Sequence, residues 1–237
     1  MAKSPNTIRV RTTLSELRKI PLLRDLSDQR LHEVASQMQV RAFSRNDIVI
    51  QRGNPSESAE LCILLQGRLK AVAYSPGGKE IGFSFIKAGD HFGEMALIDG
   101  LPRSASIISI EKSLVGFLST AVARQLMFSE PSVSEMIMRK LTTIIRQSND
   151  HIILLGHQHA LSRICALLLQ IQSKETDRSA PISIPTQQEI ASMTNTTRET
   201  VSRVFSQLQE EGVIEKSGKQ VIIHNTGLLE KHMLEGS

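Results

Sequence analysis

The chain has few of the residues on which several protein classes depend: its 237 residues include no tryptophan, one tyrosine and two cysteines. Cys62 and Cys165 lie far apart, each inside an apolar run, so we expect buried thiols in a reducing cytoplasm. An iron–sulfur sensor would need more cysteine ligands. Among the histidines only His157 and His159 stand close together, and we interpret them as polar residues at a helix junction. No catalytic arrangement of side chains is recognisable, so the sequence predicts neither an enzyme nor a metal site.

Long apolar segments are also missing. No apolar run approaches the length that crosses a bilayer, and the N-terminus, MAKSPNTIRVRTTL, lacks the hydrophobic core of a signal peptide. Apolar residues nevertheless make up 40% of the chain, which is enough for sizeable cores in about one and a half to two average domains. We therefore expect a cytoplasmic protein without membrane contact.

The basic excess is confined to the first part of the chain. The net charge is +4, but acidic residues outnumber basic ones over residues 181–237, so bulk charge does not indicate nucleic-acid binding by the C-terminal part. We interpret residues 1–20 as a solvated, partly flexible N-terminal arm. The basic residues near this end are Lys3, Arg9, Arg11, Arg18, Lys19 and Arg24.

Residues 21–130 carry the pattern of a small β-rich domain. A short helix over residues 27–38, capped by Ser27 or Asp28, precedes strand-like runs that are separated by turn signals. Short strands at close, regular spacing are typical of an antiparallel jelly roll. The expected strands are residues 40–51, 61–66, 68–74, 80–86, 105–110 and 113–118.

The loop from Phe92 to Ile107, FGEMALIDGLPRSASI, carries chemistry that suits a cyclic phosphodiester. Arg103 offers a planar, permanently charged fork for a phosphate, and free backbone amides near Ala96, at the start of a short helix, would add to it. The carboxylate of Glu94 is an acceptor and suits a ribose hydroxyl. Gly93 lets the backbone come close to the sugar.

Three further residues of the loop complete the expected site. Ser104 adds a hydroxyl beside the arginine, Ala105 keeps the floor of the site shallow, and Met95 follows the carboxylate. The alternative is a surface hairpin in which Glu94 and Arg103 form a solvated ion pair of little energetic value. Either residue alone favours that alternative, whereas the ordered string favours a nucleotide site.

Residues 131–157 have the pattern of one long helix. Its apolar residues alternate steps of four and three, which is typical of a coiled-coil seam. Ser148 falls at a seam position, either as a tolerated serine that tunes the register or as a contact to a ligand. The expected apolar seam residues are Val133, Ile137, Leu141, Ile144 and Leu155.

A helix-turn-helix pattern follows a polar segment. Residues 173–185, SKETDRSAPISIP, contain two prolines, so we expect a linker or surface loop there. A helix then starts at Thr186, which forms a capping box with Glu189. Asn195 interrupts this helix because asparagine tolerates the left-handed conformation, and a second helix starts one or two residues later. Helix, short turn and helix make a helix-turn-helix unit.

The exposed face of the second helix carries groups that can read a major groove. Arg203 can fork onto guanine O6 and N7, Glu199 can accept from cytosine N4, and Arg198 can reach a base or a phosphate. The alternative is an ordinary i,i+4 pair between Glu199 and Arg203. The following EKSGKQVII has the pattern of a two-stranded wing and favours DNA binding. The residues expected at DNA are Gln187, Thr197, Arg198, Glu199, Ser202 and Arg203.

Two parts of the chain resemble one protein family. The loop from Phe92 matches the phosphate-binding cassette of cyclic-nucleotide-binding domains, which runs Gly, Glu, apolar, Ala, Leu, a gap of four, Arg, small, Ala. Residues 186–223 resemble the winged helix-turn-helix of the cyclic-AMP receptor protein/FNR family of bacterial transcription regulators. The run from Arg198 to Arg203 matches the recognition helix of that family, and the resemblance extends over about residues 20–225.

The resemblance implies an α+β fold: an antiparallel β-roll over residues 21–130, a dimerisation helix over 131–157 and a winged helix-turn-helix over 158–237. It implies a homodimer that binds palindromic double-stranded DNA, with half-sites resembling TGTGA, and works with RNA polymerase. The implied effector is cyclic AMP, with cyclic GMP or cyclic di-GMP as alternatives, and its purine would meet Ser148 and Asn149. The rival interpretation is a nucleotide-binding regulatory module for a partner protein, which leaves the helix-turn-helix unexplained.

Overall fold

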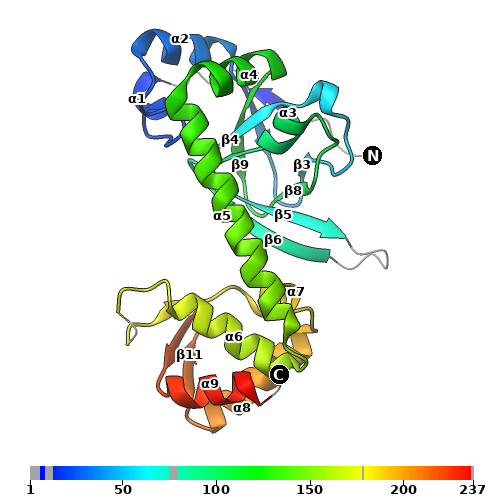
Figure 1. Ribbon diagram of the computed structural model, residues 1–237, viewed down its shortest axis with the longest axis vertical. Helices are drawn as coiled ribbons and strands as arrows, with labels where there is room; N and C mark the ends of the chain where they lie inside the picture. Colours follow the sequence, from blue (N-terminus) through cyan, green and yellow to red (C-terminus); the bar gives the residue numbers. More distant parts are fainter. Residues whose placement is uncertain (1–5, 9–12, 75–79, 178, 236–237) are drawn as a thin grey trace. The chain divides into compact units, whose positions relative to one another are not determined.

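The computed structural model describes residues 6–8, 13–74, 80–177 and 179–235. The chain divides into two compact units, Met1–Thr143 and Ile144–Ser237. The first unit holds the β-rich part, drawn in blue to green in Figure 1, and the second holds the C-terminal helices with a small sheet, drawn in yellow to red.

The first unit consists of two antiparallel sheets, short helices and the first part of a long helix. Its strands are β1 (Asn6–Ile8), β2 (Gln39–Phe43), β3 (Ile48–Ile50), β4 (Leu61–Gln66), β5 (Arg68–Tyr74), β6 (Glu80–Lys87), β7 (His91–Phe92), β8 (Ser106–Ser109) and β9 (Ser113–Leu118). Its helices are α1 (Leu14–Leu17), α2 (Asp28–Gln37), the 3₁₀ turn Ser56–Ser58, α3 (Glu94–Asp99), α4 (Thr120–Ser129) and the start of α5 (Pro131–Gly156).

The two sheets have the strand orders β1-β2-β9-β4-β7 and β3-β8-β5-β6. The expected run over residues 40–51 is two strands, β2 and β3, because Asn46 takes a left-handed conformation with a φ of 71° between them. The other expected strands agree with the structure to within a residue or so, apart from the additional short strands β1 and β7. The predicted antiparallel β-roll is therefore confirmed.

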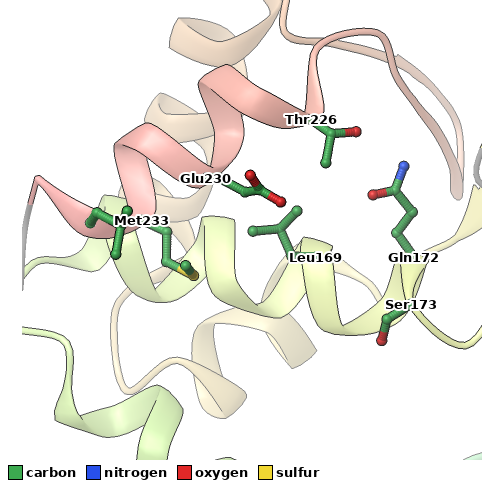
Figure 2. A pocket seen from close by; sticks show the side chains of 7 residues that line it. Leu169, Gln172, Ser173, Thr226, Glu230 and Met233 are labelled. Atoms are coloured by element: carbon green, nitrogen blue, oxygen red, sulfur yellow. The ribbon is translucent and has the colours of Figure 1, made fainter.

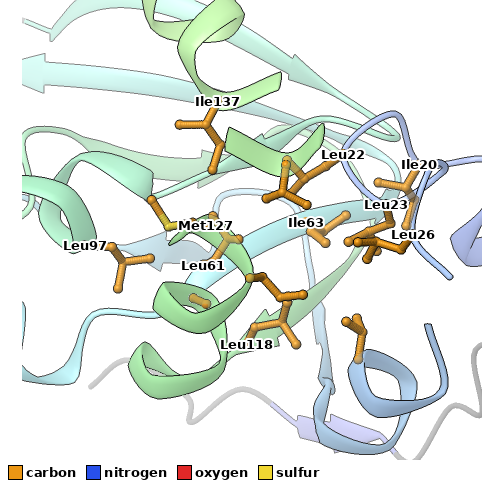
Figure 3. Close-up of a cluster of buried hydrophobic side chains, with 14 of the residues drawn as sticks. Ile20, Leu22, Leu23, Leu26, Leu61, Ile63, Leu97, Leu118, Met127 and Ile137 are labelled. Carbon is orange, nitrogen blue, oxygen red and sulfur yellow. The ribbon is translucent and has the colours of Figure 1, made fainter. Parts of the chain in front are cut away.

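Strand β4 is buried on both faces, so its sequence LCILLQ is a continuous apolar run. Leu61 and Ile63 face the helices, whereas Cys62 and Leu64 face the second sheet, as the two-residue period of a strand requires. Figure 3 shows the helix side of this strand, where side chains from the sheet and from α4 and α5 form one cluster. This core fixes the framework on which α3 and the following loop are placed.

The expectation of a solvated arm is wrong for the residues just before position 20. Leu17 is 0% and Ile20 is 5% exposed, and both belong to the core of the first unit. Helix α1 begins with a capping box, in which the Thr13 backbone N–H donates to Glu16 Oε2 at 2.8 Å. The apolar spacing of LSELRKI thus outweighs the local basic charge. Three of the basic residues assigned to the arm lie outside the described residues: Lys3, Arg9 and Arg11. The same holds for Pro76, Gly77 and Gly78, the turn signal between the expected strands 68–74 and 80–86.

The second unit packs its helices around a separate core and confirms the predicted helix-turn-helix with a wing. Beyond the end of α5, its elements are α6 (Ala160–Gln172), β10 (Ile182–Ser183), α7 (Gln187–Met193), α8 (Arg198–Glu210), β11 (Ile214–Ser217), β12 (Gln220–Ile223) and α9 (Thr226–Leu234). The core residues include Ile164 and Leu168 of α6, Ile190 of α7, and Val201 and Phe205 of α8.

The expected linker over residues 173–185 contains a strand. In β10, Ile182 pairs with Val221 of β12, so the wing is extended to a sheet with the order β10-β12-β11. Ile182 and Ile184 are 1% and 4% exposed, and the serine between them is exposed. This alternation is the signature of a half-buried strand, and the two flanking prolines concealed it.

Helix α5 confirms the expected long helix but corrects its apolar seam. The predicted seam residues Val133 and Ile137 are 0% and 3% exposed because they pack into the core of the first unit. The exposed apolar residues of this helix include Met138, Ile145 and Ile152, which lie seven residues apart, together with Ile153 and the predicted seam residue Leu155. The helix has two apolar faces, and the sequence alone does not show which of them packs into the core of the same chain.

Candidate functional site

The cassette begins at Gly93, the N-terminal cap of α3, which has a φ of 86°. A Cβ atom at this position would lie 2.6 Å from Arg103 Nη1 and 3.0 Å from the Glu60 carbonyl oxygen. Both the left-handed conformation and this close approach require glycine. The glycine therefore brings the start of α3 against the guanidinium group.

Arg103 is buried and held in one orientation. Its side chain is 8% exposed, and it donates from Nη1 to the Gly93 carbonyl at 2.8 Å and from Nη2 to the Glu60 carbonyl at 2.9 Å. Its backbone N–H donates to the Asn54 carbonyl at 3.0 Å, and the Gly53 N–H donates to the Arg103 carbonyl at 2.9 Å. The cation is thus placed in advance by main-chain carbonyls, and no carboxylate of the described residues forms an ion pair with it.

Glu94 is 3% exposed, and its Oε2 atom has no hydrogen-bond partner among the described residues. The alternative of a solvated ion pair between Glu94 and Arg103 is wrong, because both side chains are buried and the arginine is bound to carbonyl groups. A buried carboxylate oxygen without a donor is costly and suits a hydroxyl that a ligand brings. This is the acceptor expected for a ribose.

The other cassette residues lie around these two groups. Met95 is 41% exposed, and the Ser104 hydroxyl contacts its sulfur at 3.6 Å. Ala105 is partly exposed beside them. The side chain of Ala96 is 4% exposed and belongs to the helix-side core, so it supports the site from within and does not line it.

Ser148 and Asn149 are exposed on α5 and belong to the second unit, whereas the cassette belongs to the first. Their expected contact with a purine stays a prediction.

Two buried side chains near the cassette have strongly shifted pKa values. Burial raises the pKa of the Cys62 thiol well above its usual range, and burial lowers the pKa of His91 to about 3. Both groups are therefore uncharged at neutral pH.

The helix-turn-helix is built from local capping interactions. Thr186 and Glu189 form the predicted capping box at the start of α7, and the Thr186 N–H donates to Glu189 Oε2 at 2.8 Å. Asn195 has a φ of 46° and makes the left-handed turn. Thr197 caps α8 by accepting from the Thr200 N–H at 3.2 Å. Asparagine thus makes the left-handed turn between α7 and α8.

Arg163 fixes the turn from the neighbouring helix, and sequence reasoning missed it. Its Nε donates to the Thr194 carbonyl at 2.7 Å, and its Nη1 donates to the His157 carbonyl at 2.8 Å. The only sequence signal was a basic residue within the apolar run of α6. Its role is structural, because its donors face main-chain carbonyls of the same unit.

The outer face of α8 is exposed, and the alternative of an ion pair between Glu199 and Arg203 is not seen on it. Arg203 donates to the Thr200 hydroxyl at 3.4 Å, and no ion pair joins it to Glu199 in the described part of the chain. The pKa of Glu199 is lowered by hydrogen bonds from its own backbone N–H and from Thr197. The residues exposed on this helix and its cap are Thr197, Arg198, Glu199, Ser202 and Arg203, and Gln187 at the start of α7 is partly exposed.

A cavity of about 360 Å³ lies between α6 and α9 of the second unit (Figure 2). Leu169, Gln172 and Ser173 line it from α6 and the residue after it, and Thr226 and Met233 line it from α9. None of its lining residues belongs to the helix-turn-helix.

Within the described residues, no cluster of acidic, histidine or cysteine side chains could hold a metal ion, and no helix is long and apolar enough to cross a bilayer.

Two family models match the chain. The model described as a cyclic nucleotide-binding domain matches residues 40–130, and the model described as a Crp-like helix-turn-helix domain matches residues 162–232. The first match contains the cassette, and the second contains the recognition helix.

Relatives extend the similarity along most of the chain. The CRP-like cAMP-activated global transcriptional regulator of Mycobacterium tuberculosis is 26% identical over 197 residues, which cover 81% of this chain and 87% of the relative. The cyclic AMP receptor protein of Thermus thermophilus is 26% identical over 211 residues, which cover 89% and 95%. A solved structure of a CooA mutant from Carboxydothermus hydrogenoformans has a TM-score of 0.71 at 17% identity, covers 96% of this chain and 98% of that chain, and shows the same fold.

The two models match separate parts of the chain, and the two relatives align with 81% and 89% of it. The chain therefore belongs to the cyclic-AMP receptor protein/FNR family and is a DNA-binding transcription regulator with a cyclic nucleotide-binding domain.

Proposed function

We propose that the protein is a homodimer whose binding to a palindromic DNA site is controlled by cyclic AMP. The observation that carries this proposal is the cassette, where a buried Arg103 is oriented by two carbonyl groups and a buried Glu94 has one oxygen without a partner among the residues that the structure describes. A cyclic phosphate would meet a desolvated cation, and a ribose hydroxyl would meet a free acceptor. Charge-assisted hydrogen bonds of this kind are strong because little water competes for them.

Cyclic AMP is our first choice of effector because the relatives from Mycobacterium tuberculosis and Thermus thermophilus carry its name. The cassette itself does not choose the base, since Gly93, Glu94 and Arg103 address only the sugar and the phosphate. We assign that choice to Ser148 and Asn149 of α5. Cyclic GMP and cyclic di-GMP are the competing ligands that the experiment below includes.

The exposed apolar face of α5 supports the proposed dimer. Met138, Ile145 and Ile152 repeat every seven residues, and Ser148 and Leu155 lie three residues after the second and third of them. These steps of three and four are the pattern of a two-helix seam. A second copy of the chain would cover the stripe, and the proposed purine contact Ser148 would then lie within the helix contact.

On the DNA side, we propose that α8 enters the major groove with Arg198, Glu199, Ser202 and Arg203. In a two-fold dimer, two such helices read inverted half-sites, which by family resemblance are similar to TGTGA. Nucleotide controls this binding if it favours the DNA-competent arrangement of the dimer, and a coupling free energy of about 1–3 kcal/mol is typical. We also propose that the protein is cytoplasmic and that it acts together with RNA polymerase.

A gel-shift experiment tests the proposal. The duplex carries two inverted TGTGA half-sites, a scrambled duplex is the control, and each is measured without nucleotide and with cyclic AMP, cyclic GMP or cyclic di-GMP. We expect a shift of the palindromic duplex that needs cyclic AMP. A shift that depends on another nucleotide would reassign the effector. Nucleotide binding without any DNA binding would favour the regulatory module for a partner protein.

Sedimentation of two matched variants tests the seam. In Ile152→Asp a charge enters the proposed helix contact twice per dimer, so we expect the dissociation constant to rise roughly 100-fold. In Ile153→Asp an equally exposed neighbour on a different side of the helix changes, and we expect wild-type association; the two side chains are 68% and 69% exposed. Equal behaviour of the two variants would contradict the proposed seam.

A further inference from the structure

One of the two residues whose carbonyl groups orient the Arg103 guanidinium also has a charged side chain. This residue is Glu60, which lies between the 3₁₀ turn Ser56–Ser58 and the first residue of β4. Its carbonyl oxygen accepts from Arg103 Nη2 at 2.9 Å and from the Cys62 thiol at 3.7 Å. A carboxylate side chain therefore branches from the same Cα atom as a carbonyl group that holds the cation of the cassette.

The carboxylate of Glu60 is bound by Arg41 of β2 through a fork of two hydrogen bonds. Arg41 Nη2 donates to Glu60 Oε1 at 2.9 Å, and Arg41 Nη1 donates to Glu60 Oε2 at 3.2 Å. The two side chains are 23% and 28% exposed, so water screens the pair only in part. A bidentate contact of this kind fixes the direction of the carboxylate and compensates its charge.

Arg41 is itself held in place across the sheet. The strand order puts β9 between β2 and β4, and the Arg41 guanidinium lies over the ring of Phe117 in β9, 4.1 Å from the ring centre. Arg41 Nη2 also donates to Gln39 Oε1 at 3.2 Å. Phe117 is buried, so the cation rests on a fixed aromatic surface. Arg41 thus reaches over the middle strand to the start of β4.

A carboxylate released from Arg41 would compete for Arg103. The Glu60 carbonyl already contacts this guanidinium, and the Glu60 side chain starts at the adjacent Cα atom, so a freed carboxylate can turn toward the same cation. A guanidinium binds a carboxylate more strongly than it binds a neutral carbonyl group, and the buried surroundings of Arg103 strengthen such a pair. The resulting internal ion pair would occupy donors that a phosphate needs.

We propose that Arg41 is a positioning residue of the nucleotide site: it holds the Glu60 carboxylate away from Arg103 and so leaves the guanidinium available to the phosphate. This inference rests on the proposed function. Among the described residues, the partners of Arg41 are Gln39, Glu60 and the ring of Phe117. Arg41 therefore acts on the ligand through Glu60.

Calorimetry with cyclic AMP tests this role in Arg41→Met and in the double variant Arg41→Met/Glu60→Gln. In Arg41→Met we expect affinity to fall about tenfold, as when a competing contact leaves Arg103 available in about one molecule in ten. In the double variant the competing charge is gone, so most of the lost affinity should return. Thermal unfolding should be similar in the two variants because both lack the ion pair. A merely structural role of the pair would give them equal nucleotide affinities as well.

The matched control is Arg30→Met. Arg30 is 31% exposed and pairs with Glu130 at 2.8 Å, so this variant loses an ion pair of similar exposure in the same unit, between α2 and the residue after α4. We expect wild-type affinity for cyclic AMP in this variant. An equal loss of affinity in Arg30→Met and Arg41→Met would attribute the effect to the general loss of an ion pair and would contradict the proposal.

The remaining outcomes separate this inference from the proposed function. Wild-type affinity in Arg41→Met, or an equal loss in the single and double variants, would overturn the inference alone. If the wild type bound no cyclic nucleotide, the inference and the proposed function would fall together. Should Arg41→Met not fold, Arg41→Gln takes its place, because an uncharged amide keeps a polar group at this half-buried position. The same loss and the same recovery with Glu60→Gln are expected, and the absence of either would overturn the proposal.

Discussion

The two sites of this protein expose their charged residues to opposite extents. In the cassette, Arg103 and Glu94 are 8% and 3% exposed, and the arginine is fixed by carbonyl oxygens at 2.8 and 2.9 Å. On α8, Arg198, Glu199 and Arg203 are all exposed. A buried charge depends on a few exact contacts, whereas an exposed charge is screened by salt and acts through many weak contacts. Substitutions should therefore have large, local effects in the first site and small, additive, salt-sensitive effects in the second.

The largest effect is expected from Arg103→Leu. The leucine leaves the phosphate without a cation and leaves the Gly93 and Glu60 carbonyls without their donors, which should weaken nucleotide binding by about 3–5 kcal/mol. Calorimetry with cyclic AMP measures this loss, and circular dichroism checks that the variant is folded. The control is Arg45→Leu, because Arg45 is exposed in the turn between β2 and β3. Undiminished binding in Arg103→Leu would mean that the cassette does not hold the phosphate.

A second large effect should come from acid. The folded protein holds His91 neutral with a pKa of about 3, whereas an unfolded chain binds this proton near 6.5, so the unfolded state is favoured as pH falls through that interval. We expect the first unit to lose on the order of a few kcal/mol between pH 7 and pH 4.

Urea unfolding of wild type and His91→Gln at both pH values measures this contribution. The variant should lose less stability on acidification than the wild type, because it has no proton to take up on unfolding at this position. His224→Gln is the matched control, since the side chain of His224 is 48% exposed and pairs with Glu215 at the surface. An identical acid sensitivity of wild type and His91→Gln would contradict the buried, neutral state of the imidazole.

The same contrast explains which features the sequence could predict. Local signals were read correctly: the capping box of Thr186 and Glu189, the left-handed Asn195 and the breaks between most strands all depend on residues close together in the chain. The cassette was recognisable because its residues occur in one fixed order. Both recognition motifs are thus short-range patterns, which one sequence suffices to show.

What the sequence could not show depends on the choice of partner. The seam of α5 was assigned to Ile137 because either apolar face of the helix could pack inward, and only the fold shows that the chain's own core covers that face. Arg163 binds main-chain carbonyls, which leave no trace in side-chain patterns.

A moderate effect is expected at the exposed site from Arg203→Ala. Loss of a bidentate contact to guanine should cost about 1–3 kcal/mol on the palindromic duplex and relax the preference for that base. A binding selection from randomised half-sites measures both changes. Gln209→Ala is the control, because Gln209 is exposed near the other end of the same helix. Wild-type base preference in Arg203→Ala would exclude this residue from direct readout.

The smallest effect should come from Arg198→Ala and should appear mainly as a change in salt dependence. Arg198 is the first residue of α8, next to the Thr197 cap, where a side chain reaches a phosphate as readily as a base. If it contacts a phosphate, its loss releases about one counterion fewer, so the slope of log affinity against log salt should decrease by about 1 while base preference is retained. Titrations of the palindromic duplex at several salt concentrations give that slope. An altered base preference with an unchanged slope would instead assign Arg198 to a base edge.

Nucleotide binding at the cassette should be nearly independent of salt in the same range, because its charges are buried. Equal salt dependence at both sites would therefore contradict the contrast in burial from which these predictions start.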